Sequence, residues 1–446
     1  MVKKALVLGT GLVSRPCLET LLKYGFTTTC VSAIQEELDN LLKAFPTLDA
    51  ARLDVSRDKE SVQKLIKEND IVISLLPSFL HYEIALICIE ERKDLVTTSY
   101  FDEATRNLHL KAVTAGVTVL GESGLDPGID HMLATKCVDA LKEIGGQVIE
   151  LRSVCGGLPA EESKAGCMKY KFSWFPKGVF ISALQPAKCF LDGKTVEFKA
   201  VYETPENVTG SLEHYNLECL PNRDALKYRD LYSIQTASTL FRGTLRYQGF
   251  SKIVRSLFTL GLMEQSALPQ LASSAPDLTW KDFLTILLEL PTHSIEEDVE
   301  KAILGKLNGD REQMKIITEL QLISDKAVPR KSTPLDALSA HLAELLVYGP
   351  GEQDLVLMCI KVSAKLPSGQ LRSYEVFMAE KGTPVGGQSA MSRTVGITAA
   401  ACAQVLATGE VKRKGVILPI TKDIYEPVLA KLCEEGIAIK TNVIDS

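Results

Sequence analysis

The chain has 446 residues, a formal net charge of −6, 46% hydrophobic residues and 24% charged residues. This length predicts about three domains, and the composition excludes wholesale disorder. A sequence pI near 5.7 argues against nucleic acid as the partner, because a nucleic-acid binder needs a basic surface. A small anionic substrate stays compatible with this charge.

A membrane span and a metal site are both disfavoured. No stretch reaches 18 uncharged apolar residues, so we expect no transmembrane helix and no membrane partner. The chain runs almost directly into strand-like residues 5–8, which predicts a cytoplasmic protein without a leader segment. The eleven cysteines form no CxxC pair and the six histidines show no ligand spacing. We therefore expect buried thiols in a reducing compartment and no metal.

The first 125 residues alternate strand-like and helix-like segments. The strand candidates are residues 5–8, 27–31, 51–53, 71–76, 95–98 and 117–120. Amphipathic runs lie between them, at residues 17–24, 36–45, 60–68, 80–91 and 103–115. Such alternation predicts an α/β fold with a parallel sheet covered by helices on both faces.

The pattern changes after Gly145 and Gly146. The strand-like segments are then residues 148–155, 179–184, 195–201 and 355–362, and the helical ones are residues 251–346, 392–408 and 425–435. We expect a first domain over 1–127 that is completed by about 392–446. A mixed α+β domain for substrate binding or dimerisation is expected over 128–250 and 347–391, with a helical insertion over 251–346.

A glycine-rich loop follows the first strand. Residues 8–14 read LGTGLVS and join that strand to the first helix. The glycines let the backbone approach a pyrophosphate, and the helix N-terminus offers N–H groups and a positive dipole end. This context predicts a dinucleotide-binding Rossmann domain, and the alternative is a tight turn without a ligand.

The ends of the next strands would line the cofactor crevice. An acidic residue at the end of the second strand would hold the 2′-hydroxyl of NAD, and an arginine there would accept the 2′-phosphate of NADP. This chain has Ser32 at that place, so the residue that usually distinguishes NAD from NADP is missing. Asp54 and Val55 follow the third strand and Leu76 ends the fourth; the alternative is that these are ordinary loop residues.

A loop with an unusual backbone conformation is expected after the sixth strand. Residues 121–131 read GESGLDPGIDH, with three glycines, a proline and two aspartates. We expect Asp126 to lie where a substrate meets the nicotinamide. The alternative is that Asp126 and Pro127 cap the next helix. Further along, Trp174, Arg223 and Arg246 are candidate ligands, although a core aromatic and solvated arginines would explain them too.

Five stretches in this order resemble the glutamate-forming saccharopine dehydrogenases, also called saccharopine reductases. They are residues 124–131, 155–159, 170–174, 221–224 and 242–247, and the resemblance covers nearly the whole chain. Residues 73–77, which read ISLLP, and residues 221–224, which read PNRD, are most similar to the dehydrogenase half of bifunctional lysine-degrading enzymes. The resemblance implies a Rossmann domain, a mixed-sheet domain and a helical insertion.

The resemblance implies the oxidation of saccharopine with NAD(P) to glutamate and 2-aminoadipate 6-semialdehyde, or the reverse condensation. Saccharopine carries three carboxylates, which arginine suits by bidentate binding. The resemblance is compatible with a homodimer, and with a mitochondrial location if the chain is part of an animal-type bifunctional enzyme. Alternatives are another imine-forming enzyme, such as a carboxynorspermidine or homospermidine synthase, and a non-catalytic dinucleotide-binding protein.

The loops described above and this resemblance together predict which residues bind the cofactor and the substrate. Those expected around the cofactor are Gly9, Thr10, Gly11, Leu12, Val13, Ser32, Asp54, Val55, Leu76, Thr97, Thr98 and Trp174. Those expected at the substrate are Ser99, Tyr100, Asp126, Arg223, Thr244, Leu245 and Arg246. The candidate proton carriers are Tyr100, Asp126 and Cys155, and the sequence does not choose among them. NAD is favoured over NADP, because NADP-dependent fungal relatives carry arginine where this chain has Ser32; NADP stays open.

Overall fold

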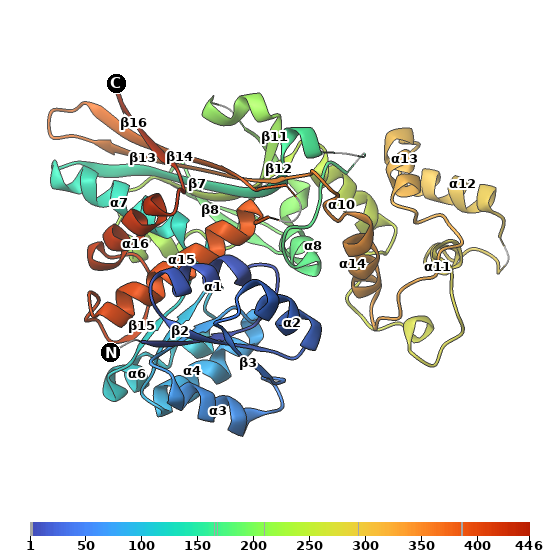
Figure 1. Ribbon diagram of the computed structural model, residues 1–446. Coiled ribbons are helices and arrows are strands. Elements are labelled where there is room, and N and C mark those ends of the chain that lie inside the picture. The colour runs from blue at the N-terminus through green and yellow to red at the C-terminus, as the bar shows by residue number, and fades with distance from the viewer. Residues whose placement is uncertain (1–2, 165, 167, 209, 293, 385–386) are drawn as a thin grey trace. The chain divides into compact units, whose positions relative to one another are not determined.

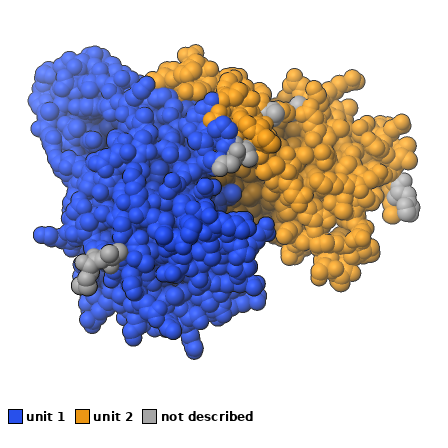
Figure 2. All heavy atoms as spheres, in the orientation of Figure 1, with its two compact units in different colours: residues 1–155, 228–237, 355–446 blue, residues 156–227, 238–354 orange. Residues whose placement is uncertain are grey.

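The computed structural model describes residues 3–164, 166, 168–208, 210–292, 294–384 and 387–446. The chain divides into two compact units, which Figure 2 shows in different colours. Unit 1 comprises Met1–Cys155, Tyr228–Ala237 and Leu355–Ser446. Unit 2 comprises Gly156–Lys227 and Ser238–Asp354.

Unit 1 contains a parallel sheet of seven strands among the described residues, in the order β15-β6-β5-β4-β1-β2-β3. The strands are β1 (Lys4–Leu8), β2 (Thr27–Ser32), β3 (Asp49–Arg52), β4 (Ile71–Ser74), β5 (Asp94–Thr97), β6 (Thr118–Leu120) and β15 (Gly415–Ile417). In β1, Ala5, Leu6, Val7 and Leu8 are all fully buried, because helices cover both faces of the sheet. The predicted α/β class is confirmed.

The helices of unit 1 follow the predicted amphipathic runs closely. They are α1 (Ser14–Lys23), α2 (Gln35–Ala44), α3 (Lys59–Glu68), α4 (His81–Glu90), α5 (Glu103–Arg106), α6 (His109–Ala115), α7 (Ile129–Glu143), α15 (Ala390–Thr408) and α16 (Lys422–Glu434), with the short 3₁₀ turn η1 (Ser78–Leu80). None of the described helices has the length and apolar character that a membrane span requires.

The C-terminal segment returns to the first sheet. Helix α15, red in Figure 1, packs along the blue helix α1 and contacts β4 and β5. Gly396 permits this packing, because a Cβ there would lie 2.6 Å from the carbonyl oxygen of Val13. The predicted segment 392–446 nevertheless does not stay with the first sheet to its end. Its last strand, β16 (Ile439–Asp445), pairs antiparallel with β14 in the second sheet.

The second sheet extends over both units. In unit 1 it contains β7 (Gln147–Pro159), β13 (Asp354–Lys365), β14 (Leu371–Lys381) and β16, in that order. Strand β7 continues into unit 2, where the order is β7, β12 (Thr239–Tyr247), β11 (Leu217–Pro221) and β10 (Glu206–Asn207). A hairpin of β8 (Ala187–Leu191) and β9 (Lys194–Phe198) pairs with β12. The pairs β10–β11, β11–β12, β13–β14 and β14–β16 of this sheet are antiparallel.

The helices of unit 2 are α8 (Pro176–Leu184), α9 (Lys227–Leu231, continuing into unit 1), α10 (Phe250–Thr259), α11 (Trp280–Leu287), α12 (Glu296–Lys306), α13 (Arg311–Glu319) and α14 (Pro334–Leu345), with the 3₁₀ turns η2 (Glu161–Ser163), η3 (Val201–Glu203), η4 (Gly210–Tyr215) and η5 (Pro269–Leu271). Unit 2 has one large apolar core, to which Tyr170, Phe172 and helices α8 and α10 to α14 contribute; α9 does not.

One predicted strand is wrong. Residues 179–184 form the end of helix α8, not a strand. Pro176 occupies the first turn of this helix, where its fixed φ and missing N–H are tolerated. Val179 and Phe180 are fully buried, and a short apolar run of this kind does not distinguish a buried helix from a buried strand.

Candidate functional site

The glycine loop meets the carboxyl end of β4. Gly9 has a φ of +97°, and its N–H donates a hydrogen bond to the carbonyl oxygen of Val31 at 2.9 Å. A Cβ on Gly9 would lie 3.2 Å from the carbonyl carbon of Leu75 and 3.4 Å from Leu76 Cδ2. Only glycine satisfies both conditions without strain. Since β1 has β2 on one side and β4 on the other, this loop lies at the topological switch point of the sheet.

The start of α1 fits a pyrophosphate. No side chain caps this helix, whose N-cap is Val13, and its first turn carries no acidic residue. Gly11 has no atom within 4 Å of the place a Cβ would occupy, and Leu12 is 67% exposed. The uncapped N–H groups and the positive end of the helix dipole suit an anion there. The residues of this loop therefore fit a dinucleotide.

A carboxylate that the sequence analysis missed lies at the end of β2. Glu37, in the first turn of α2, accepts hydrogen bonds on Oε2 from Thr10 Oγ1 at 2.5 Å and from Ser32 Oγ at 2.8 Å. The Ser32 oxygen in turn accepts from the N–H of Ile34 at 3.1 Å. Predicted cofactor residues from two strand ends thus converge on one acidic side chain.

The carboxylate of Asp54 is engaged within its own turn. Its Oδ1 accepts from the N–H of Ser56 at 3.0 Å and from the Ser56 hydroxyl at 2.6 Å, and its Oδ2 lies 3.4 Å from Arg57 Nε. The hydrogen bonds from Ser56 lower the pKa of Asp54. This geometry favours the ordinary loop interpretation for the Asp54 side chain, while Val55 beside it is half-buried at the strand end.

The loops after β5 and β6 bring together two predicted residues. The hydroxyl of Tyr100 donates to Asp126 Oδ1 at 2.6 Å. The N–H of Ser123 donates to the carbonyl oxygen of Thr97 at 2.9 Å, which ties the two strand ends together. Residues 98–100 and Asp126 are half-buried within largely buried surroundings. A phenol paired with a carboxylate can carry protons to and from a bound substrate.

Asp126 does not cap helix α7. The N-cap of this helix is Gly128, whose N–H donates to Asp130 Oδ1 at 2.6 Å, and no side chain caps the helix in the usual way. Pro127 precedes the N-cap, so it does not occupy the first turn either. The geometry therefore does not support the capping alternative for Asp126.

A buried polar network supports these two loops. Glu122 and His131 are both fully buried, and His131 Nε2 lies 2.8 Å from Glu122 Oε2. His131 Nδ1 hydrogen bonds to the hydroxyl of Tyr232 at 2.5 Å. The other oxygen of Glu122 accepts from Arg106 at 2.8 Å and from the N–H of Phe101 at 3.3 Å. The network therefore fixes the segment that carries Tyr100.

Replacing His131 by leucine is expected to destabilise unit 1. The change removes one hydrogen-bond partner each from Glu122 and Tyr232 in a buried place, which costs about 2–4 kcal/mol. The urea midpoint of unfolding measures the loss. The same change at the exposed His214 is the control and should shift stability by less than about 0.5 kcal/mol. Equal midpoints for the two variants would contradict the stabilising role of the network.

Unit 2 holds a buried arginine among the predicted residues. Arg246 is only 3% exposed and lies in β12. Its Nη1 donates to the carbonyl oxygen of Leu245 at 2.8 Å, and its Nε has no hydrogen-bond partner in the described part of the chain. The guanidinium lies over the rings of Tyr170 and Phe250, at 5.3 and 5.2 Å from their centroids. A buried cation of this kind is costly unless an anion completes its surroundings.

The carboxylate opposite Arg246 in the neighbouring strand already accepts hydrogen bonds from other residues. Glu218 lies opposite Arg246 in the β11–β12 pair, but its oxygens accept from the N–H of Gly249 at 3.2 Å and of Ser251 at 2.6 Å. Thr244 and Arg246 line the same small cavity. These contacts leave the guanidinium suited to a carboxylate from a ligand.

The other predicted residues are placed as follows. The ring of Trp174 packs against Gly178, where a Cβ would lie 2.8 Å from Trp174 Cζ3. Arg223 is exposed with a φ of +56°, and Leu245 is buried in β12. Cys155 is buried in β7. Among the described residues, no group of three or more His, Cys, Asp or Glu side chains is arranged to hold a metal ion.

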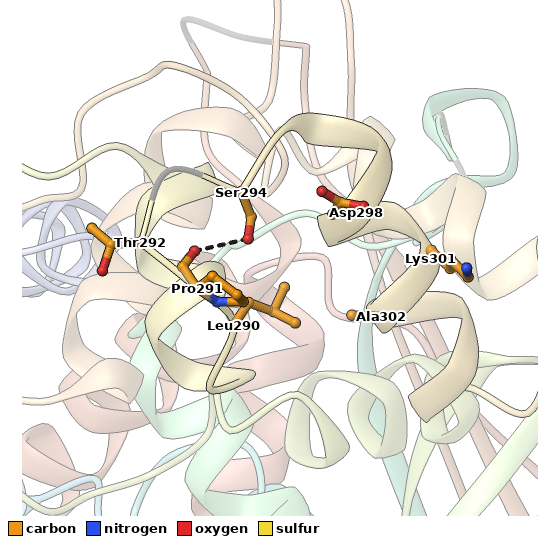
Figure 3. A pocket seen from close by; sticks show the side chains of 7 residues that line it. All are labelled: Leu290, Pro291, Thr292, Ser294, Asp298, Lys301 and Ala302. Atoms are coloured by element: carbon orange, nitrogen blue, oxygen red, sulfur yellow. Dashed lines mark hydrogen bonds between the residues drawn. The ribbon is translucent and has the colours of Figure 1, made fainter.

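A separate hollow of about 660 Å³ lies between α11 and α12 in unit 2 (Figure 3). Its described lining residues are Leu290, Pro291, Thr292, Ser294, Asp298, Lys301 and Ala302. The hydroxyl of Ser294 donates to the carbonyl oxygen of Pro291 at 2.8 Å, which closes the turn at its edge. None of the predicted site residues lines it.

Two models of known protein families match consecutive parts of the chain. The model of the saccharopine dehydrogenase NADP binding domain matches residues 5–120, and the model of the saccharopine dehydrogenase C-terminal domain matches residues 124–437. The chain belongs to the saccharopine dehydrogenase family. The resemblance stated from the motifs is thereby confirmed.

Similar proteins fall into two groups. "Alpha-aminoadipic semialdehyde synthase, mitochondrial" from Bos taurus is 40% identical over 443 residues, which are 98% of this chain and 48% of that protein. The chain thus spans about half the length of the mammalian relatives it matches. "Saccharopine dehydrogenase [NADP(+), L-glutamate-forming]" from Schizosaccharomyces pombe is 32% identical over 99% of both chains.

A solved structure supports the fold assignment. The apo saccharopine dehydrogenase (L-Glu forming) from Saccharomyces cerevisiae superposes with a TM-score of 0.88 at 32% identity, and the match covers 99% of this chain and 100% of that one. The Rossmann domain and the mixed sheet of this family member therefore share the architecture of that enzyme.

Proposed function

We propose that this protein oxidises saccharopine with a nicotinamide dinucleotide to glutamate and 2-aminoadipate 6-semialdehyde, or catalyses the reverse condensation, in lysine metabolism. The observation that carries the proposal is the full-length similarity to fungal proteins named for that reaction. The paired Tyr100 and Asp126, together with the buried cation Arg246, support it chemically.

The reaction needs proton carriers and carboxylate ligands. Loss of a hydride from the carbon beside the amine nitrogen converts the amine to an imine, water adds to that carbon, and the C–N bond breaks to release glutamate. The dinucleotide, when bound, supplies the hydride acceptor. Protons must leave the amine and the water and must reach the departing nitrogen, and we assign these transfers to Tyr100 and Asp126. Cys155 is a weaker candidate, because its thiol is buried in a strand.

Substrate charge separates this proposal from its closest alternative. Saccharopine carries three carboxylates, whereas the substrates of homospermidine and carboxynorspermidine synthases are more cationic. A buried arginine such as Arg246 stabilises the former and repels the latter. A non-catalytic dinucleotide-binding protein would have no need for this residue or for the Tyr100–Asp126 pair.

The choice between NAD and NADP is the finer part of the proposal. The names of the fungal relatives and of the N-terminal family model contain NADP, and they do not support the NAD preference expected from the sequence. The absence of an arginine at Ser32 is the sequence argument for NAD. The cytoplasmic location and the homodimer also stay predictions.

The proposed function is tested with the purified chain. Saccharopine is mixed with NAD and, separately, with NADP, and absorbance of the reduced nicotinamide is followed while glutamate is assayed. We expect the reduced nicotinamide and glutamate to form at equal rates with at least one of the two dinucleotides. Reduction without glutamate, or no reduction with either dinucleotide, would contradict the proposal.

A further inference from the structure

We propose that Glu37 binds the 2′-hydroxyl of the adenosine ribose and selects NAD over NADP. This inference rests on the proposed use of a nicotinamide dinucleotide and assigns a specificity residue to it. The sequence motif does not identify a ligand for this hydroxyl, because Ser32 replaces the acidic residue that normally ends the second strand. The structure supplies a carboxylate at the same edge from the helix that follows.

The placement of Glu37 is fixed by two buried hydroxyl groups. Thr10 and Ser32 are 8% and 7% exposed, and both donate to the same oxygen, Oε2. Among the described residues, none donates a hydrogen bond to Oε1. A carboxylate oxygen has room for further donors, so a ribose hydroxyl can complete the set. Glu37 itself is half-buried, which leaves this oxygen within reach of a ligand.

The three residues also lie where an adenosine ribose belongs in this fold. Thr10 is part of the glycine loop, whose Gly9 is hydrogen bonded to Val31 in β2. Ser32 is the last residue of β2. In a Rossmann domain the pyrophosphate lies on the first loop and the ribose lies at the end of the second strand, so a carboxylate bridging these two segments faces the ribose.

A 2′-phosphate would meet this carboxylate unfavourably. The phosphate carries about two negative charges and seeks cationic partners. In this position it would face Glu37, whose carboxylate is kept in place by the donors on Oε2. Arg52 is a positively charged side chain at this edge of the sheet, and its Nε donates to the carbonyl oxygen of Ala33 at 3.5 Å. Arg52 is exposed, so the test must exclude it as a ligand of a 2′-phosphate.

Direct binding tests the assignment without requiring turnover. Quenching of protein fluorescence and isothermal titration calorimetry give Kd values for NADH and NADPH with the full chain. We expect NADH to bind about 10- to 100-fold more tightly than NADPH, as expected for one charge-assisted hydrogen bond gained or one repulsion avoided. Glu37→Gln should remove most of this ratio, by weakening NADH and strengthening NADPH.

The matched control is Glu36→Gln. Glu36 is an exposed acid in the same first turn of α2, so its replacement changes the same charge at the same helix end without touching Thr10 or Ser32. We expect it to leave the NADH to NADPH ratio within about twofold. Arg52→Gln should likewise leave the ratio unchanged, since no 2′-phosphate is to be held. The thermal midpoint of each variant confirms folding.

Three results would overturn the assignment. One is NADPH binding as tightly as NADH to the unmodified chain, particularly if Arg52→Gln abolishes it. Another is an unchanged ratio in Glu37→Gln. The third is that neither dinucleotide binds, which also removes the proposed function. Selective NADH binding without oxidation of saccharopine would instead contradict the proposed function alone and leave the role of Glu37 supported.

Discussion

Arg246→Lys is expected to raise the KM for saccharopine by about 10- to 100-fold while leaving the Kd for the dinucleotide unchanged. Lysine keeps the positive charge but loses the planar guanidinium that binds a carboxylate through two parallel hydrogen bonds. Arg246 is buried, its Nε has no partner among the described residues, and Tyr170 and Phe250 hold the guanidinium in place. Steady-state kinetics at saturating dinucleotide measure the effect.

A second arginine in unit 2 provides the matched control. Arg255 is exposed and its Nη2 donates to the carbonyl oxygen of Glu203 at 3.1 Å, so Arg255→Lys makes the same chemical change away from the predicted ligands. We expect its KM to equal that of the unmodified protein. A KM for Arg246→Lys that matches this control would remove Arg246 from the substrate site.

The fold could be predicted from the sequence wherever burial leaves a local pattern. The inner strands of the parallel sheet, such as β1 and β4, are covered on both faces, so each appears as an apolar run between amphipathic helices. The edge strand β15 has only three residues, too few for such a run, and was not among the predicted strands. Strand β16 could not be predicted in this way, because six of its seven residues are exposed and its pairing with β14 is made by the backbone. The strand prediction for residues 179–184 was wrong for the opposite reason, since a short run that is apolar except for Ser182 does not show whether its period is that of a helix or a strand.

The site could be predicted only in part. Residues whose place follows from local sequence order were found, and residues whose role depends on contacts between separate loops were not. The glycine loop and the strand-end residues follow from local order, because the carboxyl ends of parallel strands share one edge. Glu37 could not be found, because its role depends on hydrogen bonds from Thr10 and Ser32 across two loops. The same holds for His131, whose partner Tyr232 lies about a hundred residues further along the chain.

Asp126→Asn is expected to lower kcat by about 100-fold or more, as expected for loss of a group that moves protons in the transition state. The amide has nearly the same shape, so the hydrogen bond with the Tyr100 hydroxyl is retained, but an amide does not accept a proton. Tyr100→Phe should cause a loss of similar size. If both residues belong to one proton pathway, the double variant should be little slower than either single variant.

The control for this prediction is an aspartate that does cap a helix. Asp310 accepts hydrogen bonds from the N–H groups of Glu312 and Gln313 at the start of α13. Because asparagine caps helices as well as aspartate does, Asp310→Asn should leave kcat unchanged. The change also removes the partly exposed ion pair between Asp310 and Lys252 at 2.6 Å, so the thermal midpoint should fall only slightly. If Asp126→Asn behaves like Asp310→Asn, its carboxylate plays no part in proton transfer. A kcat loss at unchanged thermal midpoint, confined to Asp126 and Tyr100, would place the proton pathway at the ends of β5 and β6.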